Sequence, residues 1–143
     1  MPDRCDALIA QAERMGFGEA LIGRRQERDA DIRTNDRSMS DDPHLADEMW
    51  SHVELSIPGA FKGRQAVELN ERMRFYRYDV GQKFDWHLDG FYRRPNGEES
   101  QVTFMVYLND DFEGGSTSFT CSVSDHMRFE PFQVRPSKGS ALF

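Results

Sequence analysis

The hydrophobic periodicity of this chain changes near Gly63, and that change limits its possible folds more than any other feature. Before Gly63 the apolar residues recur at helical spacing. After it, polar and apolar residues alternate with the period of two that is typical of strands. Turn signals such as Pro95-Asn96-Gly97 separate the alternating stretches. Helices followed by many strands predict an α+β fold, in which a sheet or barrel is backed by the N-terminal helices.

Two helices are expected before Gly63. The first has Asp3 as its N-cap and ends at Gly16, because glycine is a natural stop for a helix. The second begins near Asp42, with Pro43 in its first position, and ends before Pro58. A short strand is expected at residues 17–22, and a long surface loop at the charge-rich residues 23–40.

The strands expected after Gly63 are short and closely spaced. They are predicted at residues 66–69, 72–79, 83–89, 101–108, 116–121, 132–135 and 139–143. A length of 143 residues suits one hydrophobic core, so we expect residues 1–143 to form a single domain.

The composition favours a soluble globular protein and disfavours two classes of partner. The chain is 38% hydrophobic and 30% charged, and its net charge of −7 makes nucleic acid a poor default partner. No apolar stretch approaches the length of a membrane span, and the polar start does not resemble a signal peptide. Cys5 and Cys121 have no CxxC spacing, so we expect reduced cysteines and a cytoplasmic location.

A His-x-Asp pair, His87 and Asp89, ends one of the strand-like stretches. On a strand, residues i and i+2 point to the same face, so the two side chains are expected to lie together. The pair has two interpretations: a hydrogen-bonded pair at the end of a strand, or two adjacent ligands of a metal ion, as in the two-His-one-carboxylate triad of non-haem iron oxygenases. His52 and Glu54 fit the same pattern, but a helix turns i and i+2 in different directions.

The sequence around the pair resembles the iron- and 2-oxoglutarate-dependent dioxygenases, specifically their prolyl 4-hydroxylase-like branch. The matching motifs are R-F-Y-R-Y-D-V-G-Q-K-F at 74–84, H-L-D-G at 87–90, V-Y-L-N-D-D-F at 106–112, G-G-S-T-S-F at 114–119 and K-G-S-A-L-F at 138–143. Upstream, C-D-A-L-I, A-E-R-M-G-F and R-T-N-D-R are also similar to this family. The resemblance implies a double-stranded β-helix (jelly-roll) core behind the N-terminal helices.

The resemblance also implies roles for individual residues. His87 and Asp89 would hold Fe(II) and serve as the catalytic centre, leaving positions for 2-oxoglutarate and dioxygen. Tyr78 matches the tyrosine that binds the co-substrate. Further positions of the 2-oxoglutarate pocket match Met105, Tyr107 and Thr117. Tyr78 and Tyr107 have a second interpretation, as ordinary half-buried aromatic residues of strands.

Two further segments have two interpretations each. The loop at residues 91–97 follows the pair directly; in the family this region can cover the substrate, and otherwise it is a solvated, charged hairpin. Arg33, Asn35 and Arg37 lie in the loop before the second helix, where they either shape a substrate groove or pack the loop through salt bridges.

The resemblance predicts an incomplete domain. The family's distal histidine and the basic residue that pairs with 2-oxoglutarate would both follow Phe143, so we expect the last strand or strands of the core to be missing. Neither His44, in a helical region, nor His126, in a polar connection, is expected to replace that ligand. An exposed sheet edge would then favour self-association.

The resemblance implies hydroxylation of a C–H bond, with succinate and CO2 as co-products and ascorbate as an additional reductant. A prolyl residue in a peptide or protein is the substrate that the branch suggests. The alternative is a catalytically inactive domain that binds a peptide or protein, or a β-rich interaction domain in which the pair is structural.

Overall fold

The computed structural model describes residues 2–23, 27–57, 63–120 and 130–143. These residues form two compact units. The first unit comprises the described residues of 2–10 and 105–142, and the second comprises those of 11–104 together with Phe143. Each unit is described by itself. Cys121 and His126 lie outside the described residues.

The first helix, α1 (Pro2–Met15), confirms the predicted helix, but the predicted N-cap is wrong because Asp3 lies inside the helix. Its buried residues Cys5, Leu8 and Ala12 recur at helical spacing along one face. Gly16 ends the helix with a positive φ of 80°, and its N–H donates to the carbonyl of Ala12 at 3.1 Å. This left-handed conformation favours glycine, which is why the stop can be recognised from the sequence.

The second unit contains a three-stranded antiparallel sheet in the order β1-β2-β3. Its strands are β1 (Gly18–Glu19), β2 (Asp36–Asp41) and β3 (Arg72–Arg77). An ion pair closes each end of the β2–β3 ladder: Asp36 lies opposite Arg77, and Asp41 lies opposite Arg72. Opposite charges at directly facing positions stabilise this register.

The central position of β2 corrects one prediction. Residues 23–40 were expected to form a surface loop, yet residues 36–41 form the middle strand of the sheet. Arg33, Asn35 and Ser38 are buried polar residues of the same segment. The pattern D-R-S-M-S-D lacks an apolar face, and its partners Arg72 and Arg77 lie far along the chain, so local periodicity could not reveal the strand.

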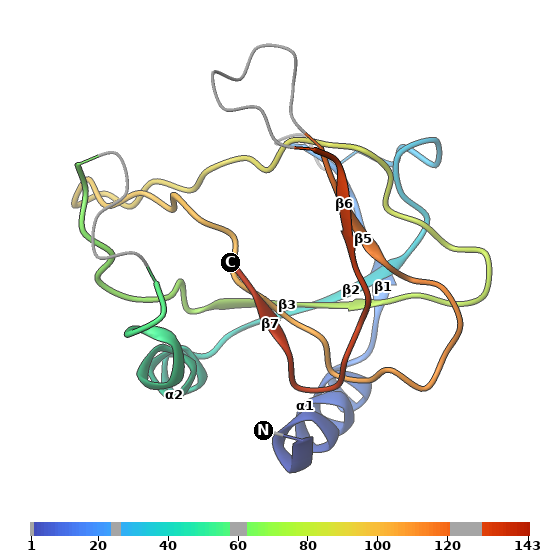
Figure 1. Cartoon of the computed structure of the whole chain (residues 1–143), viewed down its shortest axis with the longest axis horizontal. Helices are drawn as coiled ribbons and strands as arrows, with labels where there is room; N and C mark the ends of the chain where they lie inside the picture. Colours follow the sequence, from blue (N-terminus) through green and yellow to red (C-terminus); the bar gives the residue numbers. More distant parts are fainter. Residues whose placement is uncertain (1, 24–26, 58–62, 121–129) are drawn as a thin grey trace. The chain divides into compact units, whose positions relative to one another are not determined.

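The second helix, α2 (Pro43–Val53), begins where the sequence predicts. Oδ1 of Asp42 accepts a hydrogen bond from the N–H of Leu45 at 2.9 Å, and Pro43 occupies the first turn. Leu45, Ala46 and Met49 are buried. Figure 1 shows α2 at the end of the sheet where β2 leads into it.

The first unit contains two antiparallel strand pairs. β4 (Met105–Val106) pairs with β7 (Ala141–Leu142), and β5 (Thr117–Phe119) pairs with β6 (Phe132–Val134). The facing rings of Phe119 and Phe132 stack with centroids 5.0 Å apart. Cross-strand aromatic pairs of this kind stabilise short ladders.

Several predicted strands are shorter than expected. Residues 66–69 form no strand, the prediction for 83–89 is reduced to a single bridge at Phe84, and that for 101–108 is reduced to β4. The combination of helices and antiparallel strands agrees with the α+β class, while the single domain and the jelly-roll core without its last strand or strands stay predictions. Among the described residues, neither helix is long and apolar enough to cross a membrane.

Candidate functional site

His87 and Asp89 lie together, although the segment that carries them is irregular rather than a strand. Nε2 of His87 is 3.3 Å from Oδ1 of Asp89. Both side chains reach solvent, with 35% and 55% of their surfaces exposed. The expected proximity is therefore observed, but the expected strand around it is wrong.

The imidazole of His87 is hydrogen-bonded in a way that defines its tautomer. Its Nδ1 lies 2.7 Å from the backbone carbonyl of Asp85. A carbonyl can only accept, so Nδ1 carries the proton and donates it. In the neutral ring Nε2 then presents a lone pair to an anionic oxygen of Asp89. Two such atoms attract each other only through a shared proton or a cation, so this donor set fits a metal ion.

The carboxylate of Asp89 is oriented by a neighbouring hydroxyl. Oγ1 of Thr103 donates to Oδ2 of Asp89 at 2.5 Å, which leaves Oδ1 facing His87. Thr103 was not among the predicted site residues. Its signal in the sequence is its place two residues before Met105, on the same face of the predicted strand.

The ring of His87 stacks on the ring of Phe84. Their centroids are 3.6 Å apart and their planes differ by 12°. The guanidinium of Arg33 lies over Phe84 at 3.8 Å and over the ring of Tyr76 at 4.8 Å. Nη2 of Arg33 is buried and has no hydrogen-bond partner among the described residues. Sequence reasoning identified Arg33 and missed Phe84.

Tyr78 follows β3 directly and is 48% exposed. Partial burial raises the pKa of its phenol above the ordinary value, and the positive charge of Arg33 opposes that shift. The phenol therefore keeps its proton at neutral pH and can donate a hydrogen bond. A tyrosine that binds a carboxylate of the co-substrate has to donate in this way.

The other predicted pocket residues belong to the first unit. Met105 lies in β4, Thr117 begins β5, and both are half-buried, as is Tyr107. The hydroxyl of Tyr107 and Oγ1 of Thr117 are 2.5 Å apart, and either oxygen can donate. The structure therefore joins Tyr107 to Thr117 in one unit and His87 to Asp89 in the other.

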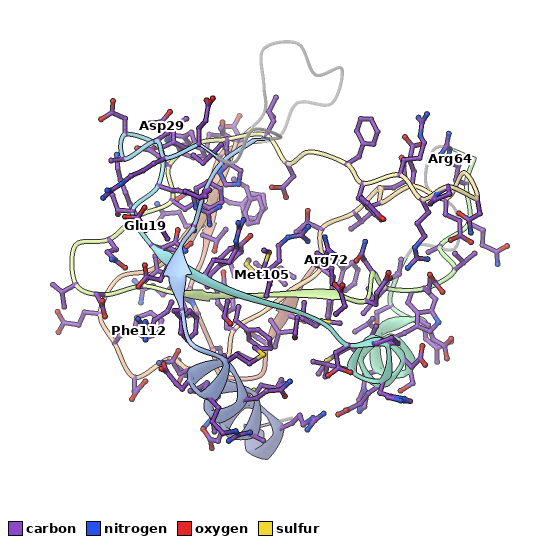
Figure 2. The ribbon with its side chains drawn as sticks, turned by 180° about the vertical axis from the view of Figure 1, so that it is seen from behind. Glu19, Asp29, Arg64, Arg72, Met105 and Phe112 are labelled. Carbon is purple, nitrogen blue, oxygen red and sulfur yellow. The ribbon has the colours of Figure 1, made fainter. Side chains whose placement is uncertain are left out.

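A hairpin of residues 92–100 follows the pair. Arg93 and Glu99 form an antiparallel bridge, and the N–H of Gly97 donates to the carbonyl of Arg94 across the turn at 3.0 Å. Its side chains make two clusters of ion pairs. Arg94 pairs with Glu68, Glu71 and Glu98, while Glu99 pairs with Arg93 and Arg64. Figure 2 shows Arg64 at the hairpin and Arg72 closer to α2.

Among the described residues, a third metal ligand is not found near the pair. Within residues 2–23, 27–57, 63–120 and 130–143, no group of three His, Cys, Asp or Glu side chains could hold a metal ion. His44 and His52 both lie in α2. The part of the chain that the structure describes thus supplies two of the donors that an iron site of the facial-triad type needs.

Comparisons with known proteins define the class of the chain. Residues 73–143 match the 2OG-Fe(II) oxygenase superfamily, where 2OG denotes 2-oxoglutarate. Among curated proteins, prolyl 4-hydroxylase 13 of Arabidopsis thaliana is 29% identical, covering 98% of this chain and 54% of the relative. Probable prolyl 4-hydroxylase 11 of the same plant is 31% identical, covering 98% of this chain and 48% of the relative. No solved structure is a significant match.

The chain belongs to the 2OG-Fe(II) oxygenase superfamily and is prolyl 4-hydroxylase-like. The family implies a double-stranded β-helix fold and a requirement for Fe(II) and 2-oxoglutarate. The chain spans about half the length of the curated relatives it matches.

Proposed function

We propose that the protein hydroxylates an unactivated C–H bond, with oxidative decarboxylation of 2-oxoglutarate to succinate and CO2. One atom of dioxygen enters the substrate and the other enters succinate, so the reaction balances without a further co-reactant. The observation that carries the proposal is the pairing of Nε2 of His87 with Oδ1 of Asp89 at 3.3 Å, in the tautomer that suits a metal.

In this proposal the chain's own groups bind and orient. Nε2 of His87 and Oδ1 of Asp89 hold Fe(II), and Thr103 fixes the rotation of the Asp89 carboxylate. The metal supplies the place where 2-oxoglutarate and dioxygen meet. Tyr78 donates its phenolic proton in a hydrogen bond to the co-substrate, while Met105, Tyr107 and Thr117 line its pocket. Ascorbate stays a prediction and takes no part in the balanced reaction.

A prolyl residue in a peptide or protein is the proposed substrate. The Arabidopsis relatives are named as prolyl 4-hydroxylases, which supports this choice. Exposed aromatic side chains also flank the pair: Trp86 is 61% and Phe91 62% exposed. Proline-rich segments dock on aromatic surfaces of this kind, because they are already extended and lose little entropy. The cytoplasmic location, the exclusion of nucleic acid and membranes, and self-association through a sheet edge stay predictions.

The proposal is tested on this chain under anaerobic conditions by calorimetry with Fe(II), with and without 2-oxoglutarate. We expect Fe(II) binding that 2-oxoglutarate strengthens. His87→Ala should weaken it more than about 100-fold, because a ligand matters more than the groups that orient it. His52→Ala is the matched control, since His52 belongs to the other His-x-carboxylate pattern and lies on α2. Equal loss in both variants would overturn the metal assignment.

Turnover is tested by adding air and a proline-rich peptide. The expected products are succinate and a peptide that carries one added oxygen atom, and neither should form with His87→Ala. Peptide binding without either product would instead identify an inactive binding module.

A further inference from the structure

Phe84 carries a flat group on each of its two faces. The imidazole of His87 lies 3.6 Å from its centroid, and the guanidinium carbon of Arg33 lies 3.8 Å from it. These distances equal one van der Waals contact, so two groups cannot share the same face. Phe84 is therefore enclosed between Arg33 and His87. The guanidinium carbon of Arg33 also lies over the ring of Tyr76, 4.8 Å from its centroid. We name the four residues Tyr76, Arg33, Phe84 and His87 the stack.

Arg33 is the fixed member of the stack. Its side chain is buried, at 6% exposure, and its Nε donates to Oδ1 of Asn35 at 3.0 Å. Asn35 is itself 2% exposed, and its Nδ2 donates to the carbonyl of Asp36 at the start of β2. A guanidinium is weakly hydrated and stacks well on aromatic faces, so it tolerates this burial better than an ammonium would.

Backbone hydrogen bonds hold the two halves of the stack in register. Arg33 and Phe84 form an antiparallel bridge. On either side of it, the N–H of Thr34 donates to the carbonyl of Lys83 at 2.9 Å, and the N–H of Asp85 donates to the carbonyl of Ile32 at 2.6 Å. These backbone bonds hold Arg33 and Phe84 opposite each other, in addition to the attraction between their side chains.

The stack supplies a constraint that the hydrogen bond of His87 lacks. The bond from Nδ1 to the Asp85 carbonyl sets the tautomer, but the terminal torsion of a histidine has a broad minimum. Stacking on Phe84 at 12° fixes the plane of the ring as well. We propose that Phe84 and Arg33 are positioning residues that aim Nε2 of His87 at the metal. The inference rests on the proposed iron site and adds two residues to it.

The first test uses the metal-free chain, so that it does not depend on iron. The ring protons and nitrogens of His87 are assigned by NMR at a pH well above the ordinary histidine pKa of about 6.5. In Phe84→Leu we expect the upfield ring-current shift of the His87 protons to vanish and the single Nδ1-protonated tautomer to become a mixture. Unchanged His87 resonances in Phe84→Leu would overturn the stack.

Phe17→Leu is the matched control. Phe17 is also half-buried, lies in the same unit, and has an arginine over its ring, because the guanidinium of Arg77 is 4.4 Å from its centroid. It lacks a histidine on its other face among the described contacts. The His87 resonances should stay the same in this variant.

The second test measures anaerobic Fe(II) affinity by calorimetry. We expect Phe84→Leu to weaken binding about tenfold, the lower end of the range for groups that orient a ligand, and Phe17→Leu to leave it unchanged. If the resonances of His87 move but the Fe(II) affinity stays the same, the stack exists but does not position His87 for the metal. That result would overturn the proposal. If the parent chain binds no Fe(II), the proposed function fails, and the NMR comparison still decides whether the stack holds the ring.

Arg33→Lys separates charge from shape. Lysine keeps the positive charge but loses the planar group, so we expect a smaller change in the His87 resonances and an affinity loss of about threefold. Circular dichroism shows whether this buried site tolerates the change. The comparison of Phe84→Leu with Phe17→Leu stands even if Arg33→Lys does not fold.

Discussion

The stack, which includes His87, and the hairpin of residues 92–100, which follows Asp89, stabilise adjoining segments through different interactions. The stack consists of aromatic rings and one buried guanidinium, with backbone bonds between residues 32–34 and 83–85. The hairpin of residues 92–100 has its own backbone bonds. Its side chains form ion pairs both within the hairpin and with neighbouring segments, at Arg64, Glu68 and Glu71.

This difference separates a more rigid part from a more adjustable part of the same unit. Contacts between flat groups at van der Waals distance depend weakly on salt, so we expect the imidazole of His87 to keep its orientation as the ionic strength changes. The ion pairs of the hairpin are partly exposed, with 23% of the Arg94 side chain and 9% of the Glu99 side chain reaching solvent. Because salt screens such pairs more than it affects stacked rings, we expect the hairpin to loosen before the stack does. A rigid ligand beside an adjustable segment would suit the site that we propose, which has to hold a metal and admit a peptide.

Removing the ring of Phe84 should produce the largest of the effects that distinguish the stack from the hairpin, and it should appear in the free energy of unfolding. Phe84→Ala leaves Arg33 and His87 without the group between them, and we expect a loss of about 2 kcal/mol in the free energy of unfolding. Urea denaturation measures it. Phe17→Ala, which loses one such contact, should cost about 1 kcal/mol. Equal costs would mean that the second flat group adds nothing to the stability of Phe84.

Removing the side chain of Arg94 should loosen the hairpin without affecting the stack. Arg94→Ala deletes the contacts with Glu68, Glu71 and Glu98. We expect the hydrogen-bonded amides of Gly97 and Ser100 to exchange about tenfold faster, as local opening becomes easier.

The amides of Thr34 and Asp85, which join the two sides of the stack, should keep their exchange rates in Arg94→Ala. Arg74→Ala, at an exposed position of β3, is the control for loss of an arginine in the same unit. Faster exchange at Thr34 and Asp85 as well would show that the two regions open together.

Acid should weaken the hairpin through Glu99. The hydrogen bonds from Arg93 and then Arg64 lower the pKa of this carboxyl below its ordinary value of 4.5. A lowered folded-state pKa means that the unfolded chain binds more protons in this range, so the stabilisation is present above pH 4.5 and is lost as the pH falls through the folded-state value.

The measurement is the protection factor of the Ser100 amide, taken from pH 6 down to about pH 3, in the parent and in Glu99→Gln. The parent should lose about threefold more protection than Glu99→Gln over this range. Glu19→Gln serves as the control, because Glu19 and its partner Arg28 form an exposed pair away from the hairpin. Parallel curves for the parent and Glu99→Gln would exclude Glu99 as the cause.

The parts of the fold that local chemistry determines could be predicted from the sequence. Asp42 with Pro43 predicts the start of α2, and Gly16 predicts the end of α1, because each acts on backbone groups a few residues away. The proximity of His87 and Asp89 was also predictable, since two residues so close in the chain have few ways to separate.

The parts that were missed depend on partners far along the chain. β2 is a strand because β1 and β3 lie on both sides of it, and its own residues carry no apolar alternation. The ring of Phe84 contacts both Arg33 and His87, and Arg33 lies far from Phe84 along the chain. Nothing in the local sequence indicates the contact between Arg33 and Phe84. Long-range pairing of polar segments therefore limits what periodicity can predict.

Salt should produce the smallest effect and the sharpest separation of the two regions. Raising ionic strength to about 1 M shortens the Debye length to about 3 Å, which weakens exposed ion pairs but not stacked or buried contacts. We expect the Gly97 and Ser100 amides to exchange about twofold faster, and those of Thr34 and Asp85 to stay unchanged. In Arg94→Ala most of this salt response should disappear, because the variant has already lost the ion pairs that Arg94 makes with three glutamates. A salt response that persists in that variant would mean that the ion pairs of Glu99 with Arg93 and Arg64, and not those of Arg94, determine the salt dependence of the hairpin.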